Sequence, residues 1–295
     1  MSKQLTEDSD SLFPIRELST RTGVNSVTLR AWERRYGLLK PFRTEKGHRL
    51  YCDRDVDRVE SILYWMNQGV AVGKVRALLD RQIDGNGPEG LESDGIDNQW
   101  RDWQEAFVEA ARAFVQGRWE QLFHEAVKQY PYHVLLLKGL FPVLQLLNSD
   151  LAIKRYVMTS LAEQITLLKL NGAKSAHHSK EKVLVVNLDE SALMSRLVAW
   201  WVVESGRSFL LVDGVTERQE LEVLQAGLTP NQTVLVAERI SEQAVKRWLQ
   251  EGRKDETTVW VGSGAWLYAE HQGVPADGWV YSNVADIIQS EFFSI

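Results

Sequence analysis

The sequence predicts a multidomain fold: a winged helix-turn-helix, then an α-helical bundle, then an α/β domain built on a parallel sheet. Three patterns predict this order. A basic N-terminal stretch places turn residues between short helical patterns, the middle of the chain spaces its apolar residues by three and four, and the C-terminal part alternates short apolar runs with amphipathic stretches. A length of 295 residues leaves room for more than one domain.

The composition excludes several classes of protein. Cys52 is the only cysteine, which excludes intrachain disulfides and multi-thiolate metal sites. No apolar run is long enough to predict a transmembrane helix, and the polar, acidic start of the chain argues against a secretory signal peptide. We therefore expect a cytoplasmic protein without a membrane partner.

Charge is distributed unevenly along the chain. The net charge is −6, which taken as a whole argues against a nucleic-acid partner. The segment from Leu12 to Tyr51, however, contains nine Lys and Arg but only three acidic residues. This window therefore carries a net charge of +6 and the remainder of the chain −12. A single arginine there is as well explained as a solvated surface charge, but nine in an otherwise acidic chain predict a surface for a polyanion.

The basic window begins with the pattern of a helix-turn-helix. Ile15 and Leu18 start a short helix, Gly23 supplies the turn, and Asn25 or Ser26 caps a second helix.

The second helix is predicted to have two different faces. Leu29, Trp32 and Tyr36 fall on one side and are expected to pack inward. The other side offers Thr and Arg side chains that suit the major groove and its phosphates. The outward and flanking positions are Val27, Thr28, Arg30, Arg34 and Arg35.

The next segment, KPFRTEKGHRLY, is predicted to form a two-stranded wing with its turn at Lys46 and Gly47. Cations alternate with aromatic residues along it, and its polar side chains are expected to reach backbone phosphates. Together, the helix and the wing give the candidate DNA-binding residues Ser26, Thr28, Arg30, Arg34, Arg35, Tyr36, Arg43, Thr44, His48, Arg49 and Tyr51.

Two further helices are predicted to close this domain, with a break at Gly69 and with Trp65 in the core. Beyond them, two glycine-rich or polar stretches predict linkers. The predicted divisions are a winged helix-turn-helix at 12–80, a flexible linker at 81–99, a helical bundle at 100–170, a second linker at 171–182 and a parallel-sheet domain at 183–295.

The last domain is predicted to be flavodoxin-like, a Rossmann-like architecture with helices on both faces of a parallel sheet. The adjacent Trp200 and Trp201 point to different faces of one helix, so one of them is expected to be exposed or at an interface. Its strands are expected at the short apolar runs 183–186, 209–212, 233–237, 258–262 and 278–282.

The run VTLRAWERRYGLLKPFRTEKGHRLY, followed by DVDRV and GVAVGKVRALL, resembles the DNA-binding module of the MerR family of transcriptional regulators. The resemblance covers residues 12–80. It implies that double-stranded promoter DNA is the partner, that the chain is a homodimer on a two-fold operator, and that RNA polymerase and regulatory proteins are further partners. Where the common family form has two adjacent tyrosines, this chain has Ala31 and Trp32.

The run RAWERRYG is similar to the branch of that family that contains cobalamin-dependent photoreceptor repressors and an enterobacterial curli regulator. Resemblance to the curli regulator implies an activator of biofilm-matrix genes.

In the photoreceptors, a D/E-x-H-x-x-G loop after the first strand supplies a histidine that ligates cobalt, and its glycine leaves space for the nucleotide tail. Here the acid is kept, the histidine is replaced by serine, the glycine by methionine, a later serine by alanine, and a Gly-Gly pair is half kept. Serine is a poor cobalt ligand, so the resemblance implies a degenerate domain for dimerisation and protein partners, with no cofactor and no metal. The corresponding positions are Asp189, Ser191, Met194, Ala237, Gly262 and Ser263.

Two other functions stay open from the residues alone. One is a ligand-gated, one-component sensor that keeps a small molecule, cobalamin or another, with Gly262, Ser263 and Asp189. The other is an enzyme of the cobalamin-mutase or flavodoxin-like kind, but no paired carboxylates and no nucleophile–base motif stand out, so we expect no enzymatic activity. Asp189 and Glu190 are better explained as an acidic helix N-terminus.

Overall fold

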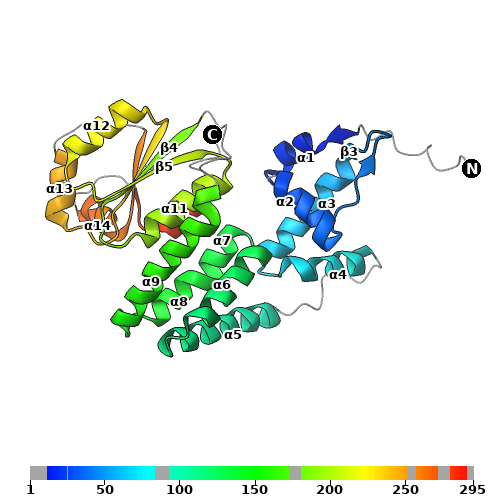
Figure 1. Ribbon diagram of the computed structural model, residues 1–295, viewed down its shortest axis with the longest axis horizontal. Helices are drawn as coiled ribbons and strands as arrows, with labels where there is room; N and C mark the ends of the chain where they lie inside the picture. Colours follow the sequence, from blue (N-terminus) through cyan, green and yellow to red (C-terminus); the bar gives the residue numbers. More distant parts are fainter. Residues whose placement is uncertain are drawn as a thin grey trace, which may run out of the picture. The chain divides into compact units, whose positions relative to one another are not determined.

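The structure, a computed structural model, describes residues 12–24, 26–83, 93–172, 181–250, 257–271 and 280–290 (Figure 1). Its contacts divide the chain into two units, Met1–Leu146 and Leu147–Ile295. None of the helices in the described ranges is long and apolar enough to cross a membrane.

The helix-turn-helix and its wing form where the sequence predicts them. Helix α1 ends at Gly23, whose φ of +69° lies in the left-handed region, and α2 continues directly into the π-helical turn η1. Asn25 lies outside the described residues, and Gly69 separates α3 from α4 as predicted. The elements are β1 (Phe13–Pro14), α1 (Ile15–Thr22), α2 (Ser26–Ala31), η1 (Trp32–Tyr36), β2 (Phe42–Arg43), β3 (Arg49–Tyr51), α3 (Asp53–Asn67) and α4 (Val72–Ile83).

The wing belongs to an antiparallel sheet of order β1-β3-β2, one strand more than the sequence predicts. Phe13 of β1 pairs with Tyr51, and Arg43 of β2 pairs with Arg49. Strand β1 has only two residues, which is too short for an alternation of apolar and polar positions, so the sequence pattern does not predict it. Because Phe13 is itself buried, β1 joins the base of the wing to the helical core.

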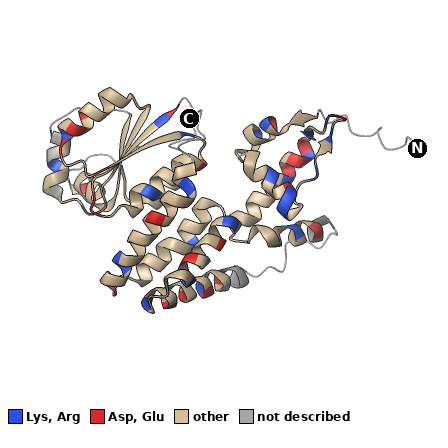
Figure 2. Ribbon diagram, viewed as in Figure 1, with Lys and Arg blue, Asp and Glu red and all other residues tan. Residues whose placement is uncertain are grey.

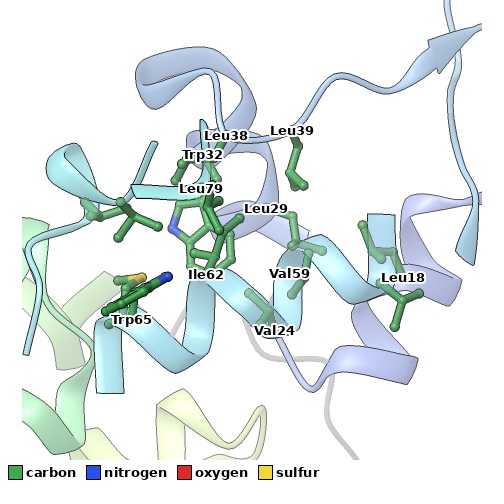
Figure 3. Close-up of a cluster of buried hydrophobic side chains, with 14 of the residues drawn as sticks. Leu18, Val24, Leu29, Trp32, Leu38, Leu39, Val59, Ile62, Trp65 and Leu79 are labelled. Atoms are coloured by element: carbon green, nitrogen blue, oxygen red, sulfur yellow. The ribbon is translucent and has the colours of Figure 1, made fainter. Parts of the chain in front are cut away.

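The core of this domain draws on all four helices (Figure 3). Leu18 of α1, Leu29 of α2 and Ile62 of α3 are fully buried, and Trp32 and Trp65 are nearly so. Burial of each large apolar side chain contributes about 1.5–3 kcal/mol. The inward face predicted for the second helix is therefore confirmed, and its burial sets which side of that helix faces solvent.

Three helical segments complete the first unit, where the sequence predicts the start of a bundle. The first begins at Ser93, and α4 continues to Ile83, so the predicted linker 81–99 was too long; residues 84–92 lie outside the described ranges. A serine followed by acidic residues is a favourable helix start, which the glycine-rich composition obscured. The segments are α5 (Ser93–Arg112), α6 (Gln116–Gln129) and a helix running through α7 (Tyr132–Val134), η2 (Leu135–Leu140) and α8 (Phe141–Leu146).

Aromatic rings form the centre of this helical part. The ring centroids of Trp103 and Phe107 on α5 are 5.3 Å apart, and that of Trp119 on α6 lies 5.3 Å from Phe107. At the other end, α7 reaches the end of α3, because Nε2 of His133 lies 2.9 Å from Oδ1 of Asn67.

The fourth helix predicted for the bundle belongs to the second unit. Helix α9 (Leu151–Ile165) and its continuation η3 (Thr166–Leu170) pack on α11 (Leu193–Glu204), so the predicted bundle 100–170 is divided near Leu147. Helical periodicity shows which side of a helix is buried, but not which partner buries it. The predicted linker 171–182 was also too long, because β4 starts at Lys182, and residues 173–180 lie outside the described ranges.

The C-terminal sheet has five parallel strands in the order β5-β4-β6-β7-β8, and all five lie at the predicted apolar runs. Leu184 and Val186 of β4 face a layer of α12, α13 and α14, whereas α11 and α15 lie on the opposite face (Figure 1). The elements are β4 (Lys182–Asn187), β5 (Ser208–Asp213), α12 (Arg218–Leu228), β6 (Gln232–Val236), α13 (Glu242–Gln250), β7 (Thr258–Val261), α14 (Ser263–His271), β8 (Val280–Tyr281) and α15 (Val284–Gln289).

The two adjacent tryptophans of α11 are both buried, with 1% of Trp200 and 8% of Trp201 exposed. Neither of them is exposed, so that part of the expectation was wrong. Helix α11 is covered from two sides, by β4 and β5 and by α9 with η3, so opposite faces of the helix are both buried. The indole N–H of Trp200 is satisfied by Glu204, at 2.8 Å.

Candidate nucleic-acid interface

The second helix of the helix-turn-helix presents the outward face that the sequence predicts. Its end is set by Gly37, with a φ of +60°, whose N–H donates to the carbonyl of Glu33 at 3.2 Å. Val27 is 68% exposed, and the side chains that share or flank its face are exposed as well. These are Thr28, Arg30, Arg34 and Arg35.

Most cations of the basic window are available to an anionic partner. Among the described residues, no ion pair engages Arg30, Arg34 or Arg35, whereas Arg21 is paired with Asp53 at 2.7 Å. In the helix-turn-helix domain, Figure 2 shows Lys and Arg along α1, α2 and the wing, whereas α3 carries acidic residues together with Arg54 and Arg58. The outward face of α2 and η1 therefore carries uncompensated positive charge.

The wing turn forms at Lys46 and Gly47 as predicted, with a φ of +79° at Gly47. Backbone hydrogen bonds close it, because the N–H of Thr44 donates to the carbonyl of His48 at 2.9 Å. The Thr44 hydroxyl accepts from the N–H of His48 at 3.1 Å, so that side chain shapes the turn. The His48 ring is exposed at the tip.

Glu33 joins the second helix to the wing, a role that the sequence analysis missed. Its Oε1 accepts from Arg43 at 2.8 Å and its Oε2 from Arg49 at 2.5 Å. The Glu33 side chain is only 13% exposed, and that of Arg49 only 24%. The sequence feature that could have revealed this role is that Glu33 is the only acidic residue among the arginines of the second helix. Arg43 and Arg49, predicted as phosphate contacts, are thus held by a carboxylate of their own chain.

The charges around Glu33 set its titration. Burial by itself raises the pKa of the Glu33 carboxyl, but the hydrogen bonds and charges of Arg49 and Arg43 outweigh it and hold the pKa below its ordinary value. The same hydrogen bond raises the pKa of Arg49. Glu33, which forms a clamp with Arg43 and Arg49, is therefore ionised at neutral pH.

We expect Glu33→Gln to weaken DNA binding about 3- to 10-fold, although it removes a negative charge from a DNA-facing domain. Charge alone predicts tighter binding, so a loss of affinity reports the release of the wing from the helix. Fluorescence anisotropy with labelled operator DNA measures it, and Glu17→Gln, an exposed acid on α1, is the matched control. Tighter binding by Glu33→Gln would contradict the clamp.

The stability of the clamp also depends on pH. Because the pKa of Glu33 is lowered in the folded state, its stabilisation is present above the ordinary glutamate pKa of about 4.3 and is lost as the pH falls through the lowered value. The difference in free energy of unfolding between the wild type and Glu33→Gln should therefore shrink from neutral to acidic pH in urea titrations.

Three predicted DNA-binding residues lie neither on the outward face of the second helix nor in the wing turn and its two arginines. Tyr51 is fully buried in the hydrophobic core of the helix-turn-helix domain, so its side chain cannot reach DNA, and its inclusion was wrong. Tyr36 is half-buried, with its hydroxyl 3.5 Å from the carbonyl of Lys128 on α6. Ser26 is half-buried at the first position of α2.

The second candidate site lies at the carboxyl ends of β4, β6 and β7. The Asp189 carboxylate accepts hydrogen bonds from the backbone N–H groups of Glu238 and Arg239, at 2.7 and 2.9 Å. Burial raises the pKa of Asp189, against the effect of these two hydrogen bonds. Since α11 begins only at Leu193, the prediction that Asp189 serves a helix N-terminus was wrong.

The other residues of this edge contact one another as well. The Ser263 hydroxyl donates to the carbonyl of Glu238 at 2.7 Å. Gly262 lies so close to Ala237 that a Cβ on it would be 2.4 Å from the Ala237 carbonyl. Ser191, between β4 and α11, and Met194, in the first turn of α11, are half-buried, and Ala237 is fully buried. Among the described residues, no group of three or more His, Cys, Asp or Glu is arranged to hold a metal ion.

Comparison with known proteins shows which family the N-terminal domain resembles. Residues 13–82 match the family described as MerR HTH family regulatory protein. The chain is 45% identical over 98 residues to the HTH-type transcriptional regulator MlrA of Escherichia coli K12, which is 33% of this chain and 36% of that protein. It is 34% identical over 127 residues to the HTH-type transcriptional repressor CarH of Myxococcus xanthus, which is 42% of each chain.

A third relative, the mercuric resistance operon regulatory protein of Bacillus cereus, is 39% identical over 67 residues, 51% of its length. The chain thus spans about a third of the length of the MlrA proteins that it matches. The similarity supports the resemblance to MlrA and CarH that the sequence motifs indicate.

Proposed function

We propose that this chain, whose residues 13–82 form a MerR-type helix-turn-helix domain, is a transcription regulator that binds double-stranded promoter DNA in a sequence-specific manner. One observation carries the proposal: the second helix exposes Arg30, Arg34 and Arg35 without ion pairs among the described residues, next to a wing held in place by Glu33. Such a helix places its side chains in the major groove, while cations of the wing reach phosphates.

We further propose a homodimer, because helix-turn-helix proteins of this kind read two half-sites related by two-fold symmetry. We also propose activation, with RNA polymerase and regulatory proteins as partners, because the run RAWERRYG resembles the branch that contains the curli regulator. The C-terminal sheet has the order 2-1-3-4-5 when its strands are numbered along the chain, which supports a flavodoxin-like domain for contacts with protein partners.

Selection of binding sites from genomic DNA by the purified full chain tests the DNA-binding proposal. We expect enrichment of a sequence with two-fold symmetry, retained against a large excess of non-specific DNA. Binding that shows no sequence preference at physiological salt would contradict it.

Cobalamin does not fit the residues at the sheet edge. Ser191 stands where the photoreceptors have the ligating histidine, and Met194 where they have the glycine that admits the nucleotide tail. The Asp189 carboxylate, which the photoreceptor motif shares, is engaged with two backbone amides. These contacts support a domain that has lost cobalamin ligation, and they also disfavour a small-molecule sensor that uses Asp189, Gly262 and Ser263.

We therefore expect protein purified from cells supplied with cobalamin to carry none. Its visible absorption spectrum should show no corrinoid bands, and its affinity for DNA should be equal in light and in darkness, because imidazole is absent from the ligating position. Stoichiometric cobalamin together with light-dependent release from DNA would overturn this part of the proposal and leave the DNA-binding part intact.

A further inference from the structure

The loops that follow β4 and β6 meet at one place on the sheet. In the order β5-β4-β6, the chain leaves β4 toward one side and β6 toward the other, so the edge between these strands is the topological switch point. Ligands of open parallel sheets bind at such points, outside the carboxyl ends of the strands.

Two hydrogen-bond donors converge at this switch point. The N–H groups of Glu238 and Arg239, consecutive residues after β6, donate to the two different oxygens of one carboxylate, that of Asp189. Successive backbone N–H groups directed at one point form a recurring anion-binding arrangement. The carboxylate thus occupies the position of a bound anion.

The Asp189 carboxylate is held in place from its own side. The N–H of Asp189 lies 3.3 Å from Oδ1 of Asn187, and the amide nitrogen of Asn187 donates to the Asp189 carbonyl at 3.0 Å. Asn187 is 2% exposed at the end of β4. The loop after β4 is therefore preorganised to present the carboxylate, which lowers the entropy cost of the contact.

The opposite loop is held just as firmly. Ser263 of α14 donates to the carbonyl of Glu238, and Gly262 packs against the backbone at Ala237 and Glu238. The charges nearby have both signs, because Arg239 attracts the Asp189 carboxylate and Glu238 repels it. The backbone N–H groups of Glu238 and Arg239, rather than the net charge around them, therefore determine which group binds at this switch point.

We propose that the N–H groups of Glu238 and Arg239 form an anion site specific for carboxylate, and that the side chain of Asp189 is its permanent occupant. The bond joins the loops after β4 and β6 and closes the sheet edge to external ligands. The inference goes beyond the proposed function, because it holds whether or not the chain binds DNA.

Rescue of a truncated side chain tests this site. Asp189→Ala removes a carboxylate and keeps Cβ, so formate replaces the missing atoms. In the full chain we expect Asp189→Ala to lower Tm by about 4–8 °C in sodium chloride. Sodium formate at about 0.2 M should restore at least half of that loss by mass action on the folded state. If the variant is unfolded at room temperature, recovery of circular dichroism on addition of formate is the readout.

Two controls isolate the carboxylate site. Asp189→Asn keeps the shape of the side chain and leaves no room for formate, so its Tm should be equal in the two salts. Glu220→Ala removes another carboxylate that accepts two backbone N–H groups, from Thr216 and Glu217, at an exposed position where water replaces it, and it should also show no rescue.

Three results would overturn the proposal. They are an Asp189→Ala variant as stable as the wild type, a loss of stability that formate does not recover, and equal formate effects in all variants. Loss of DNA binding by the wild type would refute the proposed function and leave this test unaffected.

Discussion

Replacing Arg34 by alanine is expected to lower affinity for operator DNA about 10-fold and to reduce the slope of log K against log salt concentration by about one. Arg34 is exposed on the outward face of η1, one helical turn beyond Arg30, and no ion pair holds it among the described residues. Its guanidinium is therefore free to neutralise a phosphate and release a counterion. Fluorescence anisotropy at several salt concentrations measures both quantities.

Arg118→Ala is the control for Arg34→Ala, because Arg118 is an exposed arginine on α6 whose ion pair with the exposed Glu109 is long, at 4.0 Å. Both variants lose one positive charge, and only Arg34→Ala should change the salt slope. Equal effects of the two variants would show that net charge, rather than the outward face of the second helix, governs binding.

Arg49→Ala provides a second comparison. Its Nε is bonded to Glu33 and its side chain is largely buried, so we expect affinity to fall because the wing loosens, with little change in the salt slope. Comparison of the two variants thus distinguishes an arginine that contacts phosphate, Arg34, from one that positions the wing, Arg49. Unchanged binding in both Arg34→Ala and Arg49→Ala would refute the docking of this face on DNA.

Replacing Gly262 by alanine is expected to be the most destabilising single substitution in the C-terminal unit. Its φ of +137° is a backbone conformation that residues with a Cβ rarely adopt, and the added Cβ would lie 2.4 Å from the carbonyl carbon and oxygen of Ala237. Both atoms belong to the backbone, so neither moves without breaking the loop after β6. Strain and overpacking together cost about 3–5 kcal/mol, which lowers Tm by about 10 °C or more.

Gly227→Ala is the control for Gly262→Ala. Gly227 lies in α12 with no atom within 4 Å of an added Cβ, so the same change should raise stability by about 0.5–1 kcal/mol through helix propensity. Thermal unfolding followed by circular dichroism compares the two variants. A Gly262→Ala protein as stable as the wild type would contradict the close contact between the loops after β6 and β7.

The features that the sequence predicts correctly are those that neighbouring residues encode. The turn at Gly47, the break at Gly69, the inward face of Leu29 and Trp32 and the five strands all follow from spacing or turn chemistry within about ten residues. The basic character of the outward face is likewise a local property, because it depends on which residues stand three and four positions apart.

The features that it misses join residues that are distant in the chain. Glu33 meets Arg49 only after the wing folds back, which turns a predicted phosphate contact into an internal ion pair. Tyr51 is buried because β3 brings it into the hydrophobic core that the four helices form. Trp200 and Trp201 are both buried because α9 and η3 cover the side of α11 that the sheet does not.

The amino-acid sequence alone is therefore sufficient to identify a basic, winged helix-turn-helix followed by helices and a parallel sheet. Through the resemblance to the photoreceptors, it also predicts that Ser191 stands at the position of a cobalt-ligating histidine. It does not show that Asp189 binds the amides of Glu238 and Arg239, some fifty residues away, because a backbone N–H has no signature in the sequence. The spacing of apolar residues indicates which side of a helix or strand is buried. Which residues contact that side depends on tertiary packing and on the need to satisfy every buried polar group.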